Sequence, residues 1–379
     1  MEVDGEVDGS VLTVECVVLR LLEMPLVKPF VTSAQTMAVR PFVLVEIQAE
    51  GLSGFGECVA MPDPYYTEET VETAWHVLRT FAVPALVGQR LNRPEETAAR
   101  LAPIKGNRMA KAALEAAVWD WFGKKQGMSL RDMLGGVRDR VPVGVSLGIY
   151  PRITDLLRDV ERYLEEGYRR IKVKIKPGWD VDVLAAIRRS FGDIPLTADA
   201  NMAYSPADVE TLRRLDEFGL LYIEEPLTGE HVWEYEDLQK KISTPVCLDE
   251  TVRSRSDVEL ALRLNAGRVL SVKAGRVGGL TEVLHIHRLA REVDIPLWCG
   301  GMLESGVGRA MNLAMAALPG FVYPGDISAS DRYYARDIVH PPAVLNEDGT
   351  VDVPTGPGIG VELDWEAVNH HTIRIERIP

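Results

Sequence analysis

The stretch RIKVKIKPG, residues 170–178, sets the pattern for the second half of the chain. Its alternation places Lys172, Lys174 and Lys176 on one face of an extended segment and three apolar side chains on the other. Taken alone, the stretch also fits a solvent-exposed edge strand, where lysines are common. The sequence that follows separates these two interpretations, because charged residues recur in it at even spacing.

Short apolar runs follow this stretch, and each brings a charged residue at its end. The runs are IPLTADAN, LLYIEEP, PVCLDET and VLSVKAG. The steps from Lys174 to Asp199, Glu224, Asp249 and Lys273 are 25, 25, 25 and 24 residues. A step of this length accommodates one strand, one helix and two loops, so the five residues occupy equivalent places on successive strands. In a closed parallel barrel those places ring the mouth where active sites are built.

We therefore predict an α/β fold with two domains. Residues 138–344 alternate strands and helices in seven βα units, and FVYPGDIS takes the place of an eighth. Functional residues on consecutive strand ends favour a TIM-like barrel over a doubly wound sheet, which gathers its site at one switch point. Residues 1–137 combine a strand meander with helices, which predicts an α+β capping domain. We expect residues 345–379 to complete that domain.

Composition narrows the classes of function. The 379 residues carry a formal net charge of −14, which argues against a broad basic surface for nucleic acid. No apolar run is long enough to span a membrane, and the acidic start MEVDGEVDGS does not resemble a signal peptide. The cysteines are scattered and form no CxxC pair. We expect a cytoplasmic protein that acts on a small molecule.

Asp199, Glu224 and Asp249 offer only oxygen donors, and no histidine or cysteine joins them at ligand spacing. Oxygen donors suit Mg²⁺ or Mn²⁺ better than Zn²⁺. A single carboxylate is better explained as a helix cap or as the partner of a barrel lysine than as a metal ligand. Three carboxylates in phase favour metal binding. We predict a Mg²⁺ site, in which Mn²⁺ or another divalent cation can substitute.

Lys174 and Lys273 are predicted to face each other across that metal. A lysine acts as a base only when its pKa is lowered toward neutrality. Nearby positive charge lowers the pKa of a lysine. Lys172 supplies such charge beside Lys174, and the cation supplies it to both lysines. Arg276 has two interpretations, which are a similar effect on Lys273 and a solvated side chain. Proton loss from a metal-bound carboxylate substrate gives an enediolate. Bases on both faces permit racemisation, whereas one base and a β-leaving group permit elimination.

The Gly-rich stretch GRVGG, residues 275–279, opens a predicted helix. It admits two interpretations, which are anion binding at the helix N-terminus and close packing of the helix. It lacks the Lys-Ser/Thr ending of a phosphate-binding loop.

Together, these motifs resemble the enolase superfamily, in the branch related to muconate-lactonising enzymes, over nearly the whole chain. The resemblance is carried by KVKIKPGWD, TADAN, IEEPL, CLDET, VKAGRVGG and the helix AKAALEAAVWDWFG. Within the branch, PLWCGGMLESGVGRAMN and YPGDISASDRYY resemble o-succinylbenzoate synthases that are also N-acylamino acid racemases. Two positions depart from the pattern that the family often shows. Ala274 stands where relatives often have proline, and Glu225 stands where they often have glutamine.

The resemblance implies a (β/α)₇β barrel under an α+β cap, with cap loops at about residues 26–36 and 59–66 closing the mouth. It implies Lys174 and Lys273 as the acid–base pair, and Asp199, Glu224 and Asp249 as Mg²⁺ ligands. The substrate contacts that it implies are Lys172 for the carboxylate, and Ser146, Asn201, Gly301, Met302 and Leu303. It further implies a homo-oligomer, either a dimer or an octamer.

Two activities follow from the resemblance. The first is dehydration of 2-succinyl-6-hydroxy-2,4-cyclohexadiene-1-carboxylate to o-succinylbenzoate, in menaquinone synthesis. The second is racemisation of N-acylamino acids, N-succinylamino acids among them, and it is an alternative physiological role. A Schiff-base aldolase would leave the three carboxylates unexplained. A non-catalytic binding barrel would leave the flanking lysines unexplained.

Overall fold

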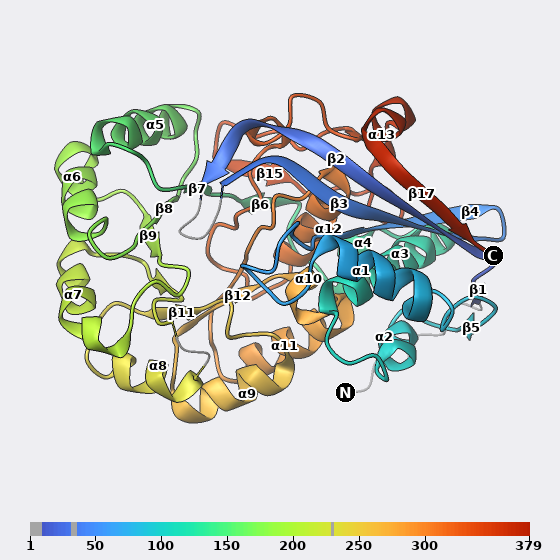
Figure 1. The fold of residues 1–379 in the computed structure, drawn as a ribbon, viewed down its shortest axis with the longest axis horizontal. Coiled ribbons are helices and arrows are strands. Elements are labelled where there is room, and N and C mark those ends of the chain that lie inside the picture. The colour runs from blue at the N-terminus through green and yellow to red at the C-terminus, as the bar shows by residue number, and fades with distance from the viewer. Residues whose placement is uncertain (1–9, 32–35, 229–230) are drawn as a thin grey trace.

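The computed structural model describes residues 10–31, 36–228 and 231–379. The acidic N-terminal residues 1–9 and residues 32–35 of the predicted first cap loop lie outside the described residues. A barrel of parallel strands ringed by helices lies beside a long, twisted antiparallel sheet (Figure 1). No helix in the described ranges combines the length and apolar character needed to cross a membrane.

In the described part of the chain, seven parallel strands form the barrel wall, and each pairs with the next one along the chain. Their side chains are buried because helices cover the outside of the wall and side chains fill its interior. This arrangement confirms the predicted series of βα units. The strands are β7 (Val145–Leu147), β8 (Ile171–Lys174), β9 (Leu196–Asp199), β10 (Ile223–Glu224), β11 (Val246–Leu248), β12 (Val269–Val272) and β13 (Leu297–Cys299).

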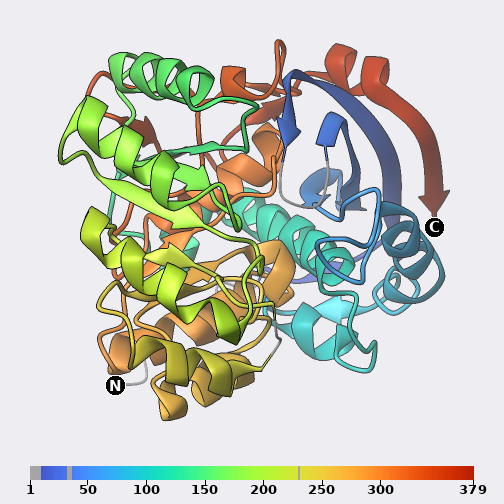
Figure 2. The same ribbon diagram turned by 60° about the vertical axis from the view of Figure 1, so that its left-hand side comes forward.

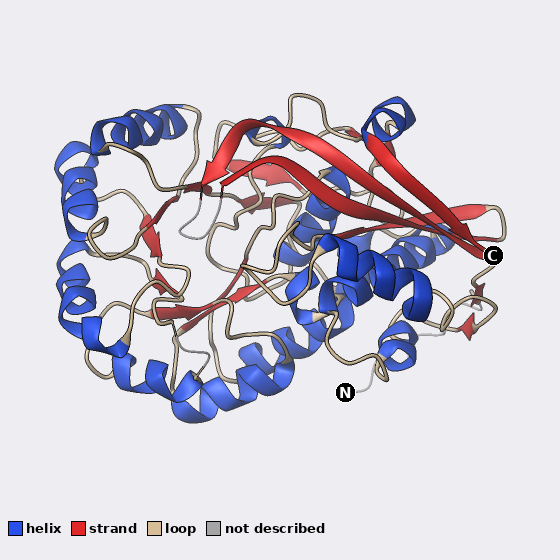
Figure 3. Ribbon diagram, viewed as in Figure 1, coloured by secondary structure: helices blue, strands red, loops and turns tan. Residues whose placement is uncertain are grey.

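Helices return the chain between the strands and form the outer arc of the barrel (Figure 3). In α5, for example, Leu156, Val160 and Tyr163 lie three or four residues apart and are buried against the barrel. The helices are α5 (Ile153–Glu165), α6 (Val181–Phe191), α7 (Val209–Arg214), α8 (Val232–Gln239), α9 (Arg255–Leu264), α10 (Ala274–Val277), α11 (Leu280–Glu292) and α12 (Gly306–Ala316).

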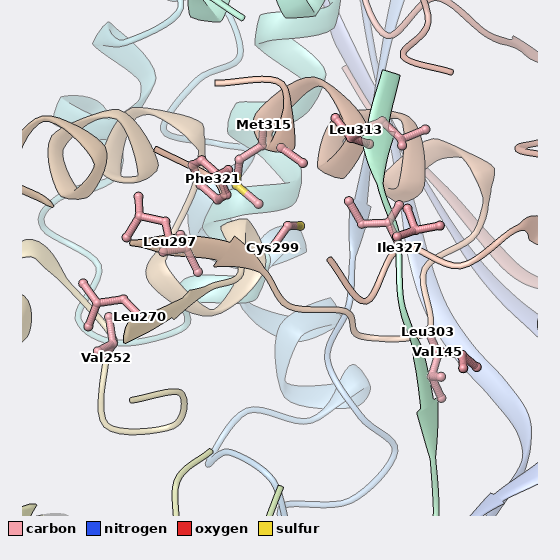
Figure 4. Close-up of a cluster of buried hydrophobic side chains, with 14 of the residues drawn as sticks. Val145, Val252, Leu270, Leu297, Cys299, Leu303, Leu313, Met315, Phe321 and Ile327 are labelled. Carbon is pink, nitrogen blue, oxygen red and sulfur yellow. The ribbon is translucent and has the colours of Figure 1, made fainter. Parts of the chain in front are cut away.

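The segment FVYPGDIS closes the barrel between its first and last strands. On one side, Val322 N donates to Leu297 O at 3.0 Å and Asp326 N to Cys299 O at 2.9 Å. On the other side, Gly144 N donates to Gly325 O at 2.8 Å. Phe321 and Ile327 belong to the cluster of buried apolar side chains between β13 and α12 (Figure 4). The segment thus stands in for an eighth strand, as the sequence predicted.

The cap is built on a four-stranded antiparallel sheet in the order β17-β2-β3-β4. Its strands are β2 (Cys16–Val31), β3 (Thr36–Ala49), β4 (Leu52–Cys58) and β17 (Thr372–Ile378). The C-terminal strand β17 pairs with β2, so the tail does return to the cap as expected. The prediction of a loop from residue 26 is wrong, because β2 continues to Val31 and pairs there with β3. The domain bounds at residues 137 and 344 stay predictions.

The remaining α-helices and strands lie in the cap and in the connecting segments. In the cap they are β1 (Leu12–Thr13), α1 (Val71–Val77), β5 (Arg90–Leu91), α2 (Glu96–Leu101), α3 (Arg108–Gln126) and α4 (Leu130–Leu134). Elsewhere they are β6 (Arg140–Pro142), β14 (Val339–His340), β15 (Thr350–Asp352), β16 (Glu362–Leu363) and α13 (Trp365–His371). Since β15 pairs with β6, the tail contacts the start of the barrel region as well as the cap sheet.

Helix α3 lies between the cap sheet and the barrel (Figure 2). Its buried Glu115 accepts a hydrogen bond from Thr281 N at 2.9 Å, at the start of α11. Gly279, which precedes α11, has a φ of 134°, and a Cβ there would lie 1.5 Å from Glu115 Oε2. The helix N-terminus that follows GRVGG therefore receives a carboxylate of the protein itself, Glu115, and packs closely against it.

Candidate active site

Three carboxylates stand side by side at the carboxyl ends of neighbouring strands. Asp199 ends β9 and Glu224 ends β10, and the two residues are paired in register. Asp249 directly follows β11. All three are at most 1% exposed. The equal spacing of these residues in the sequence therefore does bring them together in space.

Each predicted lysine contacts one of these carboxylates. Lys174 Nζ lies 2.6 Å from Asp199 Oδ2, and Lys273 Nζ lies 2.7 Å from Asp249 Oδ2. Lys172 Nζ lies 2.8 Å from Glu224 Oε2. The three amino groups are thus buried in the barrel mouth and are not the solvated lysines of an edge strand.

Two of these lysines have a pKa above the ordinary value. Burial by itself lowers the pKa of Lys273, but the negative groups around it, the carboxylate of Asp249 foremost, together raise it above its usual range. Burial likewise lowers the pKa of Lys172, and the charges of Asp326, Glu224 and Asp199 raise it well above its usual range. For Lys273, like charge therefore does not dominate in the structure, because Asp249 Oδ2 lies 2.7 Å from its Nζ. The lowering expected from a bound cation stays a prediction.

A hard divalent cation fits the donor chemistry of this site. Glu224 Oε1 is buried and has no hydrogen-bond partner among the described residues. The carboxylates of Asp199, Glu224 and Asp249 supply only oxygen donors, as Mg²⁺ and Mn²⁺ prefer. Within the described ranges, however, no three acidic, histidine or cysteine side chains are arranged to hold an ion, since the lysines attract the carboxylate oxygens.

Two residues outside the predicted site residues contact Lys273 or its partner Asp249. Arg276 is 2% exposed and forms an ion pair with Asp249, so it is buried and not solvated. Tyr66, from the cap, accepts hydrogen bonds from Lys273 Nζ at 2.7 Å and from Arg276 Nη1 at 3.2 Å. The cap loop at residues 59–66 was predicted, but nothing in the sequence singled out Tyr66.

A cavity opens over these groups. Among the predicted site residues it is lined by Ser146, Lys172, Lys174, Asp199, Asn201, Lys273, Gly301, Met302 and Leu303. Glu224 and Asp249 lie beneath its floor and do not line it. Residues that the sequence did not assign also line it: Phe30, Met37, Met61, Tyr65, Tyr66, Met202, Glu250, Asp326 and Tyr333. The cap thus supplies an apolar and aromatic roof over a charged floor.

Several polar groups hold this floor in place. Asn201 accepts a hydrogen bond from Lys174 Nζ at 2.5 Å and donates one to Glu250 Oε1 at 2.9 Å. Glu225 accepts hydrogen bonds from Asp249 N at 2.6 Å and from the hydroxyl of Tyr235 at 2.9 Å. Burial raises the pKa of Glu225 to about 7, although these hydrogen bonds oppose the increase. The carboxyl of Glu225 therefore supports the backbone that carries Asp249.

Comparison with known proteins places the chain in a family. Residues 155–368 match the model of an enolase C-terminal domain-like family. The chain belongs to the enolase superfamily. Residues 15–135 match the N-terminal domain of the mandelate racemase and muconate lactonizing enzyme family, so the superfamily's two domain types follow each other in this chain. The fold predicted from the family resemblance is confirmed.

Curated members of the superfamily are similar over almost their whole length. An o-succinylbenzoate synthase of Geobacillus kaustophilus is 50% identical over 362 residues, which cover 95% of this chain and 96% of the relative. An N-succinylamino acid racemase of Thermus thermophilus is 49% identical over 362 residues, which cover 96% and 98%. A solved structure of an enolase superfamily member from Listeria innocua has a TM-score of 0.93 at 42% identity, covering 96% of this chain and 98% of that one.

Proposed function

We propose that the protein abstracts the α-proton of a small carboxylate substrate, with Lys174 and Lys273 as its acid–base pair. The observation that carries the proposal is that both lysines line one cavity and come from opposite sides of its floor. Lys174 ends β8 and Lys273 follows β12, with three strands between these two. A substrate α-carbon held between them presents one face to each lysine, which is the geometry that proton removal and redelivery require.

The remaining lining residues orient the substrate. Ser146 is 4% exposed, and its Oγ has no hydrogen-bond partner among the described residues, so it is available to a substrate oxygen. Lys172 offers positive charge to the substrate carboxylate, and Asn201 lies beside Lys174. Gly301, Met302 and Leu303 form the wall against which the rest of the substrate packs.

Asp199, Glu224 and Asp249 would hold a divalent cation, Mg²⁺ or Mn²⁺, as the resemblance to the superfamily implies. When bound, such a cation stabilises the negative charge that develops on the substrate carboxylate. The unpartnered Glu224 Oε1 supports this assignment, because a buried carboxylate oxygen is costly to leave without a partner.

The first activity that we propose is the synthesis of o-succinylbenzoate, a dehydration in menaquinone synthesis. In this reaction Lys174 takes the α-proton and then assists departure of the β-hydroxyl as water. A relative with this name is 50% identical over almost the whole chain.

The second activity is racemisation of N-succinylamino acids or other N-acylamino acids. It uses both lysines, because one removes the proton from one face and the other returns a proton to the opposite face. A relative with the name N-succinylamino acid racemase is 49% identical, so identity alone does not separate the two activities.

We further propose a cytoplasmic homo-oligomer, a dimer or an octamer, with the capping domain at residues 1–137 and 345–379 and the barrel at 138–344. The four cysteines are free and buried, which suits a reducing compartment. The net charge of −14 supports a small-molecule partner and not a nucleic acid.

The test is α-proton exchange of N-succinyl-L-phenylalanine in D₂O with Mg²⁺, followed by NMR and polarimetry. Wild type, Lys174→Ala and Lys273→Ala are compared. Exchange with loss of optical rotation in the wild type, and no racemisation in either variant, supports the two-base site. An assay of o-succinylbenzoate formation then ranks the two activities. Absence of exchange in the wild type rejects the racemase, and absence of both activities rejects the proposed function.

One further outcome points to different chemistry. Trapping of a substrate–lysine adduct by borohydride would favour a Schiff-base aldolase. Mg²⁺ binding without any proton exchange or dehydration would favour a non-catalytic binding barrel.

A further inference from the structure

Two buried charges of opposite sign reach from the cap toward the same segment of the barrel. Arg40 on β3 is 0% exposed and Glu57 on β4 is 5% exposed. Neither contacts the lysines or carboxylates of the floor, so the chemistry proposed above does not use them. A buried charge is costly unless its hydrogen-bonding groups are satisfied, which makes the partners of these two residues informative.

Arg40 is satisfied by backbone carbonyls. Its guanidinium donates to Val59 O at 2.6 Å, to Ala60 O at 2.8 Å and to Met302 O at 3.3 Å. No carboxylate of the described residues forms an ion pair with it. Val59 and Ala60 begin the cap loop that carries Tyr66, and Met302 belongs to the turn after β13. Arg40 therefore joins two segments that wall the cavity from different domains.

Glu57 is satisfied by the start of α12. Its carboxylate accepts from Ser305 N at 3.0 Å, from Ser305 Oγ at 2.5 Å and from Gly308 N at 3.0 Å. These amides have no partner within the helix, and the positive end of the helix dipole favours an anion there. Burial raises the pKa of Glu57 to about 7, while the hydrogen bonds from Ser305 and Gly308 oppose the increase.

The segment between these contacts, residues 302–308, carries one wall of the cavity. Met302 and Leu303 line the cavity, and Met302 also packs in the apolar core of the cap. Leu303 has a φ of 59°, a conformation that a leucine adopts only where its surroundings hold it. Tyr334 contributes a hydrogen bond of 2.6 Å from its hydroxyl to Leu303 O.

We propose that Arg40 and Glu57 are positioning residues, which hold the 302–308 segment from the cap and thereby fix the Met302–Leu303 wall of the substrate cavity. The inference rests on the proposed function for the identity of the substrate. Loss of either contact frees the wall without touching Lys174, Lys273 or the carboxylates. Substrate binding therefore weakens while the chemical step is retained.

Glu115 offers a matched control for Glu57. It is also a buried cap glutamate at the N-terminus of a barrel helix, α11, where it accepts from Thr281 N, and burial raises its pKa to about 7 as well. It does not line the cavity. Glu115→Gln thus removes an equivalent cap-to-barrel contact and an equivalent charge, without releasing a wall of the cavity.

The experiment compares kcat and KM of wild type, Glu57→Gln and Glu115→Gln for N-succinyl-L-phenylalanine, with Mg²⁺ present. In Glu57→Gln one carboxylate oxygen is replaced by an amide NH₂ group, which cannot accept the hydrogen bonds from Ser305 or Gly308. The contact is therefore broken while the side chain keeps its size and shape. We expect KM to rise about tenfold in Glu57→Gln, with kcat within about threefold, and KM to be unchanged in Glu115→Gln. An unchanged KM in Glu57→Gln, or an equal rise in both variants, overturns the proposal.

A second measurement tests the positioning role without any substrate, and so does not depend on the proposed function. It follows the hydrogen exchange of the backbone amides. We expect faster amide exchange at residues 302–308 in Glu57→Gln than in the wild type, and no such change in Glu115→Gln. If Glu57→Gln does not fold, Arg40→Lys is measured instead, because one ammonium cannot reach all three carbonyls of Val59, Ala60 and Met302. If the amides of residues 302–308 exchange as slowly in Arg40→Lys as in the wild type, the proposal is overturned. If the wild-type enzyme does not turn over the substrate, only the proposed function is contradicted.

Discussion

The hydroxyl of Tyr66 is predicted to keep Lys273 in its working position. Lys273 Nζ donates to this oxygen at 2.7 Å, and the centroid of the Tyr66 ring lies 4.9 Å from the same nitrogen. Tyr66→Phe removes the hydroxyl and retains the ring. It removes the short hydrogen bond from Lys273 together with the longer contacts of the hydroxyl to Arg276 Nη1 at 3.2 Å and to Asp249 Oδ2 at 3.4 Å. A hydrogen bond to a charged group contributes about 1.5–3 kcal/mol. At about 1.4 kcal/mol for each factor of ten, proton transfer through Lys273 slows about 10- to 150-fold.

The assay separates the two lysines by using single-lysine backgrounds. In Lys174→Ala, α-proton exchange of N-succinylphenylalanine depends on Lys273, so adding Tyr66→Phe gives the full decrease. In Lys273→Ala, exchange depends on Lys174, which does not contact Tyr66, and adding Tyr66→Phe changes the rate less than about threefold. Both enantiomers are followed by NMR in D₂O. An equal decrease in both backgrounds, or none in the Lys174→Ala background, refutes this role of the hydroxyl.

Three further predictions concern charge, metal and packing. Burial raises the pKa of Glu115 in the folded protein to about 7 from the ordinary 4.5, so its stabilising contribution is present below pH 4.5 and is lost as the pH rises through 7. The difference in thermal midpoint between wild type and Glu115→Gln therefore decreases from pH 5 to 8, and a constant difference contradicts this. Dialysis against EDTA abolishes proton exchange, and added Mg²⁺ restores it. Glu224→Gln raises the Mg²⁺ concentration needed for half-maximal exchange about tenfold or more. An exchange rate that does not depend on metal contradicts the metal site. Trp298→Ala lowers the free energy of unfolding in urea by about 3–5 kcal/mol, because its fully buried ring stacks on Tyr222; a loss below about 1 kcal/mol contradicts that role.

The sequence was sufficient for the barrel and for the ring of charges at its mouth. Strands in a βα series pair in chain order, so an equal spacing in sequence becomes an equal height on the wall. Asp199 and Glu224 are accordingly paired in register, and Lys174 is paired with Asp199. These positions depend on local periodicity alone, which is why they were predictable without any knowledge of distant contacts.

The cap required the tertiary structure. Tyr66 and Lys273 are 207 residues apart, and no local pattern records that a cap loop will reach the last lysine of the barrel. The end of β2 was also misplaced, because its pairing with β3 as far as Val31 is decided by the partner strand and not by the residues of β2 alone.

The charges of the site were also predictable in part from the sequence and in part only from the structure. The kinds of charge, three carboxylates between two lysines, followed from the sequence because residue type and strand phase are local properties. The sign of the pKa shift of Lys273 did not, because it depends on burial and on the carboxylate of Asp249 at 2.7 Å. The burial of Arg276 against that carboxylate had the same origin. Sequence periodicity thus determined which groups meet, whereas distances of a few ångströms between segments far apart in the chain decided how they interact.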